Sequence, residues 1–507
     1  MPNTFFITTP IYYVNDIPHI GHAYTSIAAD FIARYKRMNN IETMFLTGTD
    51  EHGQKIQKAA ENKSISPIEL CNHNSEKFRE LTEILNLSND DFIRTTEKRH
   101  KEGAKNLWNK LNENGDIYLD KYEGWYSISD ETFYNEKDLF KQSDGSYKTI
   151  TGGPVEWIEE ESYFFKLSSY SEKLLKLYNE HPDFILPKSR RNEVISFVKS
   201  GLKDLSVSRN TFNWGIEVPN DKNHVMYVWL DALSSYPNSI GYIGNTDSNL
   251  SHYWHNTTHI VGKDILRHHA VYWPAFLMSA KLELPKRVFA HGWWTNEGNK
   301  ISKSLGNVIN PIEIINQYGL DQIRYFVLRE ITFGNDGDFS ISALKSRINA
   351  DLSNDLGNLC QRSLTMINKH CNSRIPKRDN IGDTEKQFLE KLFYLLPELS
   401  LHIDNQEINL YLKKIWDIVA ETNKYFNDSK PWELKDTNKK SFENILYVTA
   451  DIIKQIAIMI YPVMPQTSVK ILSLFSIEED SIKIDSLNIN IENIELGNVK
   501  PLFPRVE

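Results

Sequence analysis

Two histidines near the start of the chain, His19 and His22, have the type and spacing of a phosphate-binding pair. They belong to the run His19-Ile20-Gly21-His22, which follows an expected strand at the point where the next helix begins. Backbone N–H groups at a helix start favour phosphate, and two imidazoles three residues apart can donate to its oxygens. Gly21 lets a flat base or a ribose approach the backbone. The alternative is a pair of surface histidines beside a turn.

A lysine-containing loop much later in the chain is the second candidate group. The run from Lys300 to Ser304 reads Lys-Ile-Ser-Lys-Ser and has a glycine two residues away on either side. Its two lysines, Lys300 and Lys303, could neutralise a polyphosphate while negative charge moves onto a leaving group. Taken alone, a loop of this composition is more typical of a solvated surface.

Short apolar strands and an amphipathic helix must position the histidine pair. Residues 4–9 predict a buried strand that ends at Pro10, because proline cannot continue a central strand. Apolar residues at helical spacing predict a helix from about 24 to 38, and residues 43–47 predict a second strand. This order is typical of a parallel α/β sheet, in which ligands bind beyond the carboxyl ends of the strands. The pattern returns as a strand at 257–261, a helix at 265–281 and a strand from 286 to 290.

Two other regions have a different texture. Residues from about 115 to 215 are rich in turn-forming and aromatic residues, so we interpret them as a mixed α+β insertion that splits the sheet domain. After about 345 the pattern is helical, and Gly357, Gly382 and Gly497 are the only glycines there. This composition predicts a helical domain. A length of 507 residues agrees with about three domains.

Composition and charge exclude several classes of protein. With 58 basic and 67 acidic residues the net charge is −9, which rules out a histone-like polycation but not a local basic face. The three cysteines, Cys71, Cys360 and Cys371, can form neither a disulfide framework nor a four-thiolate zinc site. The first basic residue is Arg34, which argues against a signal or transit peptide, and the longest apolar runs are too short to cross a bilayer. We therefore expect a cytoplasmic chain without a membrane partner.

The histidine and lysine groups together resemble the two signature motifs of the class I aminoacyl-tRNA synthetases. Further motifs, spread over essentially the whole chain, are similar to those of methionyl-tRNA synthetases. They are Gly-Thr-Asp-Glu-His-Gly at 48–53, Tyr-Val-Trp-Leu-Asp-Ala at 227–232, Gly-Lys-Asp-Ile at 262–265, Tyr-Trp-Pro-Ala at 272–275 and Leu-Phe-Pro-Arg at 502–505.

The resemblance implies an α/β fold: a Rossmann-type parallel sheet split by an α+β insertion and followed by an all-α, helical anticodon-binding domain. It also implies an enzyme that activates L-methionine with ATP and transfers it to the terminal ribose of tRNA(Met). The expected ranges are 1–114 and 216–292 for the two halves of the catalytic domain, 115–215 for the insertion, 293–345 for the lysine-loop and stem-contact region, and 346–507 for the anticodon-binding domain.

For ATP, the resemblance implies that His19 and His22 contact the phosphates and stabilise the transition state, while Lys300 and Lys303 close over pyrophosphate. Gly21 would lie under the adenine. Gly262 and Asp264 would hold the ribose, since a carboxylate suits paired hydroxyl groups. Mg²⁺ is expected to accompany ATP. The family usually has Met at the position of Ile301, an apolar exchange from which we expect little effect.

For methionine, the resemblance implies that Asp50 pairs with the ammonium group and that aromatic and aliphatic residues surround the side chain. Such a wall suits an unbranched, polarizable thioether, although each aromatic could instead be ordinary core. An apolar pocket separates one methylene by only about 1–3 kcal/mol, so we expect homocysteine to be activated and partly removed in the same site. The family often has Pro where Leu233 stands. The pocket residues are Ile11, Tyr13, Trp229, Leu233, Tyr236, Ile265, His269 and Trp273.

For tRNA, the resemblance assigns anticodon reading to Asn358, Arg362 and Trp432. Asn358 and Arg362 lie four residues apart and therefore share one helix face, and a tryptophan can stack on an unpaired base. Residues 188–209 are locally basic, which fits either contact with the tRNA acceptor arm or a solvated helix face. Because many relatives carry a C-terminal dimerisation domain that finds no match before Glu507, we expect a monomer.

Many relatives carry zinc-binding Cys-x-x-Cys knuckles in the insertion, but Ser127-Ile128-Ser129-Asp130 occupies the matching place here. Ser and Asp do not make a tetrahedral thiolate site, so we expect no structural zinc and no metal-ligating residues. His252 and His255 could bind a metal in principle, but two surface histidines are the simpler interpretation.

Three other classes of protein compete with this one: other class I synthetases, a non-catalytic paralogue and small nucleotidyltransferases. Valyl, isoleucyl and leucyl enzymes usually carry a much larger insertion, and a cysteinyl enzyme would need metal-ligating cysteines in its pocket. A non-catalytic tRNA-binding paralogue has no need for the intact histidine and lysine motifs. Small nucleotidyltransferases share the His-x-Gly-His motif but lack a helical domain of this kind.

Overall fold

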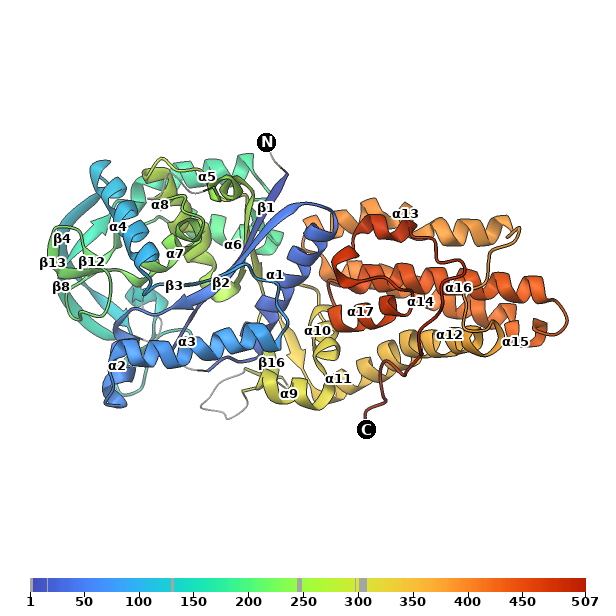
Figure 1. Cartoon of the computed structure of the whole chain (residues 1–507). Helices are drawn as coiled ribbons and strands as arrows, with labels where there is room; N and C mark the ends of the chain where they lie inside the picture. The colour runs from blue at the N-terminus through green and yellow to red at the C-terminus, as the bar shows by residue number, and fades with distance from the viewer. Residues whose placement is uncertain (1–2, 16, 129–131, 244–248, 297, 301–307) are drawn as a thin grey trace. The chain divides into compact units, whose positions relative to one another are not determined.

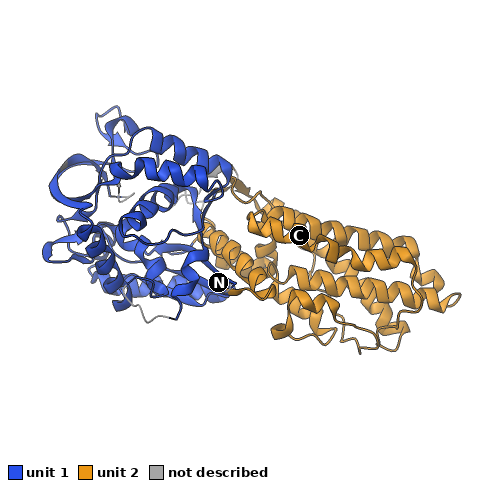
Figure 2. Ribbon diagram, turned by 90° about the horizontal axis from the view of Figure 1, so that it is seen from above, with its two compact units in different colours: residues 1–18, 43–291 blue, residues 19–42, 292–507 orange. Residues whose placement is uncertain are grey.

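The computed structural model describes residues 3–15, 17–128, 132–243, 249–296, 298–300 and 308–507. The chain divides into two compact units, residues 1–18 with 43–291 and residues 19–42 with 292–507 (Figure 2). Among the described residues, no helix combines the length and the apolar character needed to cross a membrane.

A six-stranded sheet is the centre of the first unit (Figure 1). Its pairings β2–β3, β1–β14, β14–β15 and β15–β9 are parallel, as the strand–helix–strand patterns predicted. The chain runs outward from β1 to β2 and β3 in one direction and from β14 to β15 in the other, so the strand order switches between β1 and β14. In order across the sheet the strands are β3 (Asp91–Arg94), β2 (Glu42–Asp50), β1 (Thr4–Tyr13), β14 (Thr257–Gly262), β15 (Arg287–His291) and β9 (Ile185–Leu186).

The first strand is longer than its sequence predicted. We expected it to end at Pro10, but β1 continues to Tyr13. Its register with β14 runs from Phe6 to Thr8, so the proline lies beyond these paired residues and its missing N–H removes none of these bonds. The longer strand carries Ile11 and Tyr13 to the carboxyl edge of the sheet.

The insertion is mixed α+β, as its texture predicted. A four-stranded antiparallel sheet in the order β10-β8-β4-β5 forms its main body. The short strand β9 lies within the range expected for the insertion, yet it pairs with β15 at the edge of the main sheet. The elements are β4 (Ile117–Ser127), β5 (Thr132–Tyr134), β6 (Phe140–Lys141), β7 (Tyr147–Lys148), β8 (Glu156–Phe165), α5 (Ser171–Glu180), α6 (Lys188–Lys199), β10 (Leu205–Ser206) and β11 (Ser208–Arg209).

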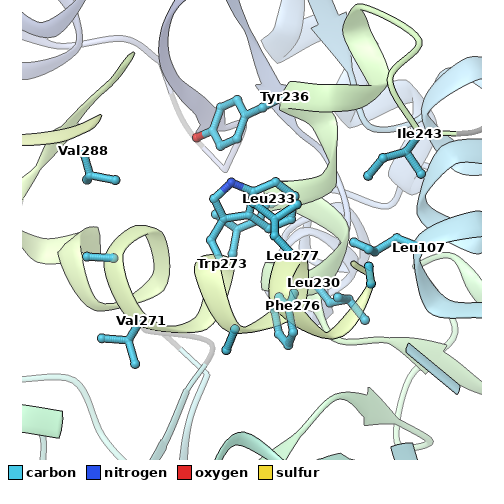
Figure 3. Close-up of a cluster of buried hydrophobic side chains, with 14 of the residues drawn as sticks. Leu107, Leu230, Leu233, Tyr236, Ile243, Val271, Trp273, Phe276, Leu277 and Val288 are labelled. Carbon is cyan, nitrogen blue, oxygen red and sulfur yellow. The ribbon is translucent and has the colours of Figure 1, made fainter. Parts of the chain in front are cut away.

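The remaining helices of the first unit include those that carry most of the candidate pocket. We expected one helix over 265–281, but the segment consists of a 3₁₀ turn at Lys263–Ile265, a π-helical turn at His268–Tyr272 and α8 (Trp273–Ser279). Figure 3 shows Trp273, Phe276 and Leu277 of α8 packed with apolar side chains of α7 (Val228–Ser239) in one buried cluster. The other helices are α2 (Gln54–Asn62), α3 (Pro67–Ile84), α4 (Lys98–Glu113) and α7 (Val228–Ser239).

The second unit is helical after about 340, as the glycine-poor sequence predicted. It also contains α1 (Ile20–Met38) and a small sheet in the order β17-β16-β18, which consists of β16 (Trp294–Asn296), β17 (Asn299–Lys300) and β18 (Gly337–Phe339). The helices are α9 (Pro311–Tyr318), α10 (Leu320–Arg329), α11 (Ile341–Arg347), a π-helical segment (Ile348–Gly357), α12 (Asn358–His370), α13 (Asp383–Asp404), α14 (Ile408–Ser429), α15 (Pro431–Leu434), α16 (Lys439–Ile460) and α17 (Pro465–Ser473).

A buried charged group holds α1 within this unit. The Asp30 carboxylate of α1 accepts from Arg34 Nε at 2.8 Å and from Arg324 Nη2 at 2.6 Å. Arg324, on α10, also donates to the carbonyl oxygens of Pro462 and Val463 at 2.9 and 2.8 Å. Asp30 and Arg324 are fully buried. The middle of α1 is therefore attached to α10 and to the turn that follows α16.

Candidate active site

The side chains of His19 and His22 cap the first turn of α1. His19 is the N-cap residue, and its Nδ1 accepts from the backbone N–H of Gly21 at 3.1 Å. The Nδ1 of His22 accepts from the backbone N–H of His19 at 3.0 Å. Because Nδ1 is an acceptor in both rings, a neutral ring carries its proton on Nε2. The two imidazoles, with centroids 3.8 Å apart, are thus Nε2–H donors at a helix start, as a phosphate site requires.

Burial and the neighbouring imidazole both lower the pKa of His22. Burial, and to a lesser degree His19, lowers the pKa of His22 well below its usual value, so His22 is neutral near pH 7.

Gly21 is needed for a steric reason that the sequence alone did not reveal. A Cβ at this position would lie 2.9 Å from Cε1 of His19, so any side chain would displace the capping ring.

The lysine motif is only partly within the described residues. Lys300 lies on β17, whose backbone pairs with β16 so that Lys300 is opposite Thr295. Lys303 and Ile301 lie outside the described residues. The roles assigned to both lysines stay predictions.

The proposed ribose residues lie at the carboxyl end of β14. Gly262 ends the strand and is buried, whereas Asp264 follows in the 3₁₀ turn and is exposed. A Cβ on Gly262 would collide with Oδ1 of Asp264, so the glycine lets this carboxylate lie against the strand end. The edge of the sheet beside the switch between β1 and β14 is where ligands bind in open α/β folds.

The structure brings the predicted methionine residues together from four segments. Ile11 and Tyr13 end β1, and Asp50 ends β2 with 8% of its surface exposed. The other members lie on α7 and on the helical turns after β14. One apolar cluster contains, or packs against, all of the apolar members: Ile11, Tyr13, Trp229, Leu233, Tyr236, Ile265 and Trp273.

His269 is the polar member of this set, and its hydrogen bonds define its state. Its Nδ1 lies 3.0 Å from the carbonyl oxygen of Ile265, so Nδ1 carries the proton and donates. Its Nε2 therefore accepts from the Tyr236 hydroxyl at 2.7 Å. Burial lowers the pKa of His269 to about 4. The pair is a neutral wall with a phenolic oxygen, which suits an uncharged thioether better than a charged side chain.

Two histidines next to this wall were missed by the sequence analysis. His268 stacks on Trp229 with ring centroids 3.8 Å apart and planes 14° apart. His259 of β14 shares a 2.8 Å hydrogen bond with Thr8 Oγ1, and its ring centroid lies 4.4 Å from that of Tyr236. The adjacent His-His pair was a visible signal for His268. A histidine inside an apolar strand was the weaker signal for His259.

In the second unit, two of the three predicted anticodon residues meet. The Arg362 guanidinium lies 5.7 Å from the ring centroid of Trp432 and 5.5 Å from that of Phe426. Arg362 Nη1 also donates to Asn427 Oδ1 at 3.0 Å. Asn358 is exposed one turn earlier on α12, and Trp432 is 39% exposed. Exposed aromatic and guanidinium groups side by side can stack on and hydrogen-bond to an unpaired base.

The basic stretch at 188–209 is less exposed than its sequence suggested. Arg209 is 2% exposed, lies over the rings of Tyr126 and Tyr227, and donates to Ser206 Oγ at 2.9 Å, so it is a core residue and not a phosphate contact. Arg191 donates to the carbonyl oxygen of Tyr178. The remaining basic residues lie mainly on α6.

Metal ligands were not expected, and the part of the chain that the structure describes contains no group of three or more His, Cys, Asp or Glu side chains able to hold a metal ion. Ser127 is buried at the end of β4, whereas Ser129 and Asp130 lie outside the described residues. The absence of zinc therefore stays a prediction.

Comparison with known proteins agrees with this geometry. The fold is that of a class I tRNA synthetase, and the family model described as tRNA synthetases class I (M) matches residues 5–364. A second model, described as the anticodon binding domain of methionyl tRNA ligase, matches residues 375–500. The chain belongs to the methionyl family of class I tRNA synthetases.

Individual relatives are similar over nearly their full length. A methionine–tRNA ligase from Rickettsia felis is 53% identical over 483 residues, which cover 95% of this chain and 93% of the relative. One from Rhizobium meliloti is 50% identical and covers 99% of this chain and 98% of its own. The solved structure of Mycobacterium tuberculosis methionyl-tRNA synthetase in complex with methionyl-adenylate is 45% identical, covers 100% of both chains and superposes with a TM-score of 0.96.

Proposed function

We propose that this chain is a methionine–tRNA ligase. It activates L-methionine with ATP to give methionyl-adenylate and pyrophosphate, and it then transfers the methionyl group to the 3′ terminal ribose of tRNA(Met). The observation that carries this proposal is the hydrogen-bonded Tyr236–His269 pair within the buried cluster of aromatic and aliphatic side chains. Family membership supports the same reaction.

In the first step a methionine carboxylate oxygen attacks the α-phosphorus of ATP, and the bond to the β-phosphate oxygen breaks as pyrophosphate leaves. The Asp50 carboxylate pairs with the substrate ammonium, and the pocket residues surround the thioether. Together they hold the carboxylate in line with the phosphorus, so that orientation lowers the barrier. No side chain needs to act as a covalent nucleophile.

Charge stabilisation is the second contribution. The Nε2–H donors of His19 and His22 stabilise the negative charge that builds up on the phosphate oxygens. Lys300 and Lys303 neutralise the departing pyrophosphate, and Gly262 and Asp264 hold the ribose. Mg²⁺ bound to ATP would add positive charge beside its phosphates.

In the second step a hydroxyl of the terminal tRNA ribose attacks the methionyl carbonyl carbon, and AMP leaves with the electrons of the broken acyl–phosphate bond. Selection of tRNA(Met) rests on Arg362 and Trp432. Asn358 lies one turn before Arg362 on α12. A monomer suffices for both steps, because the residues assigned to methionine activation and to tRNA selection belong to one chain.

The decisive experiment is amino-acid-dependent ATP–pyrophosphate exchange, measured with each of the twenty amino acids and without tRNA. Exchange with methionine alone supports the pocket assignment. Exchange with valine, isoleucine or cysteine instead would keep the chemistry and overturn the pocket. A folded chain that exchanges with no amino acid would favour a non-catalytic tRNA-binding paralogue.

A further inference from the structure

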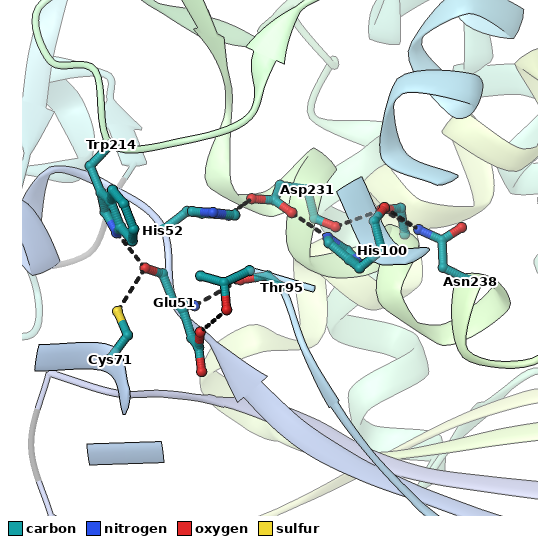
Figure 4. Close-up of polar contacts among 10 residues, drawn as sticks. Glu51, His52, Cys71, Thr95, His100, Trp214, Asp231 and Asn238 are labelled. Atoms are coloured by element: carbon teal, nitrogen blue, oxygen red, sulfur yellow. Dashed lines mark hydrogen bonds and ion pairs between the residues drawn. The ribbon is translucent and has the colours of Figure 1, made fainter. Parts of the chain in front are cut away.

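A buried carboxylate in the first unit joins two histidines from two other elements. Asp231, in the first turn of α7, accepts from His52 Nδ1 at 2.7 Å through Oδ2 and from His100 Nε2 at 2.5 Å through Oδ1 (Figure 4). The exposed fractions of Asp231, His52 and His100 are 1%, 2% and 0%. This trio therefore ties the segment after β2 and the first turn of α4 to the helix that carries much of the pocket.

The surroundings of Asp231 stabilise its carboxylate in the ionised form. Complete burial alone would raise the pKa of Asp231, but the two imidazoles outweigh burial and lower it to about 2. Both carboxylate oxygens have a partner, as a buried charge requires. Removing either histidine would leave one oxygen of a buried carboxylate without its hydrogen bond.

The His52 side of the trio leads to the proposed ammonium site. His52 lies two residues after Asp50, in a turn whose other bonds go to different elements. The carbonyl oxygen of Glu51 accepts from Trp214 Nε1 at 2.6 Å, and its carboxylate accepts from Arg94 at 2.6 and 3.0 Å. From this turn His52 reaches Asp231 of α7, so it links the strand end that bears Asp50 to the helix that bears Trp229, Leu233 and Tyr236.

The His100 side of the same carboxylate leads away from the pocket. His100 is in the first turn of α4, and its carbonyl oxygen accepts from Asn238 Nδ2 of α7 at 3.2 Å. A Cβ on Gly103 would collide with the Asn238 side chain, so the two helices pack closely at this point. None of the residues predicted to bind a substrate lies on α4. The trio thus has one arm toward the ammonium site and one arm toward a supporting helix.

We propose that His52, acting through Asp231, is a positioning residue that holds Asp50 at the correct distance from the α7 wall of the methionine pocket. This inference rests on the proposed function and deepens it. The covalent skeleton of methionine limits how far its ammonium group and its thioether can lie apart, so the two ends of its site must keep a separation within that reach. A turn tied to α7 by a buried ionic hydrogen bond provides that constraint.

The two arms supply a matched pair of variants. His52→Ala and His100→Ala each remove one hydrogen bond to the same carboxylate oxygen pair, so both should lower thermal stability to a similar extent. In methionine-dependent pyrophosphate exchange, we expect His52→Ala to raise the KM for methionine about tenfold and His100→Ala to leave it within about twofold. The KM for ATP should stay close to that of the unmodified chain in both variants.

A deaminated ligand tests whether the effect passes through Asp50. Calorimetric binding of methionine should weaken in His52→Ala, whereas binding of 4-(methylthio)butanoate, which lacks the ammonium group, should be unchanged. His52→Asn places an amide N–H near the position of Nδ1, and we expect it to restore most of the methionine KM. If His52→Ala does not fold, the binding of methionine and of 4-(methylthio)butanoate is compared in His52→Asn and Asp231→Asn instead. Equal weakening of the binding of both ligands in Asp231→Asn would overturn the proposal.

Two other outcomes would contradict the inference and are separable from failure of the proposed function. Equal changes of the methionine KM in His52→Ala and His100→Ala would mean that the trio is only a structural bridge. Equal loss of methionine and 4-(methylthio)butanoate binding would mean that Asp50 is not the residue affected. Absence of methionine-dependent exchange in the unmodified chain would instead refute the proposed function itself.

Discussion

The hydroxyl of Tyr236 donates to Nε2 of His269 over 2.7 Å, while Nδ1 of the same ring donates to the carbonyl oxygen of Ile265. Because the Tyr236 hydroxyl uses its proton in the bond to His269, its oxygen can act only as an acceptor toward a ligand at this wall. We expect Tyr236→Phe to raise the KM for methionine about tenfold, because His269 loses its donor and a buried acceptor is left without a partner. Methionine-dependent pyrophosphate exchange measures the change, and an unaltered KM would contradict the assignment.

Acidification should weaken the fold through His269. Its pKa is about 4 in the folded chain and near 6.5 when unfolded, so between these values the unfolded state binds more protons. The stability contribution is therefore lost as the pH falls from about 6.5 to about 4, by up to about 3 kcal/mol. Urea unfolding at pH 7 and pH 5 should show a smaller difference in His269→Gln than in the unmodified chain. An identical difference in both would mean that other buried histidines account for the pH dependence.

His19→Asn separates helix capping from phosphate binding. The asparagine Oδ1 can replace Nδ1 as the acceptor for the Gly21 N–H, but the Nε2–H donor is lost. We expect normal thermal stability and a fall in the adenylation rate of about a hundredfold or more, with little change in methionine binding. Single-turnover adenylate formation is the measurement. His19→Ala is the control, since it should add a capping loss of about 1 kcal/mol to the same kinetic defect.

Removing the exposed tryptophan should affect tRNA and not activation. Trp432→Ala takes away a stacking surface worth about 1–3 kcal/mol per base. We expect kcat/KM for charging of tRNA(Met) to fall at least tenfold while methionine-dependent pyrophosphate exchange stays constant. Phe426→Leu serves as a control for packing beneath Arg362. A parallel fall of both activities in Trp432→Ala would show that the variant is misfolded or that Trp432 has another role.

The buried pair Asp30–Arg324 should be a determinant of stability. Arg324→Met leaves a fully buried carboxylate without the guanidinium that donates to it at 2.6 Å. Breaking such a pair costs about 3–5 kcal/mol, so we expect a clear loss in urea unfolding. Arg374→Met, which removes an exposed pair with Glu495, should cost less than about 1 kcal/mol. Similar losses for both variants would mean that Asp30 is satisfied by its other partners.

Local sequence was enough for the elements that depend on local patterns. The alternation of strand and helix, a helix start close to His19-Ile20-Gly21-His22 and the helical region after about 345 were predicted and are present, although apolar periodicity placed the start of α1 near residue 24 and it begins at Ile20. Hydrophobic periodicity and capping residues act over a few positions, so they can be recognised without knowledge of the partner elements. The family motifs likewise sit in short contiguous runs, and the family was recognisable from them alone.

The errors of the sequence analysis came from contacts made at a distance along the chain. Pro10 was expected to end a strand because its missing N–H would break a ladder, but it lies beyond the residues of β1 that pair with β14, and this depends on the register of the two strands. Arg209 was counted as a surface cation, yet its cover comes from Tyr126 and Tyr227. Neither partner is visible from the local sequence.

The sequence by itself determined the fold class, the order of the elements, the family and the identity of the candidate substrate-binding side chains. Only the tertiary structure decided their chemical states and supports. Asp231 meets a histidine 179 residues away, and Tyr236 meets His269, 33 residues away. A hydrogen-bond direction or a pKa depends on which groups lie within about 3 Å and on how much water is excluded, and both are set by packing between distant segments.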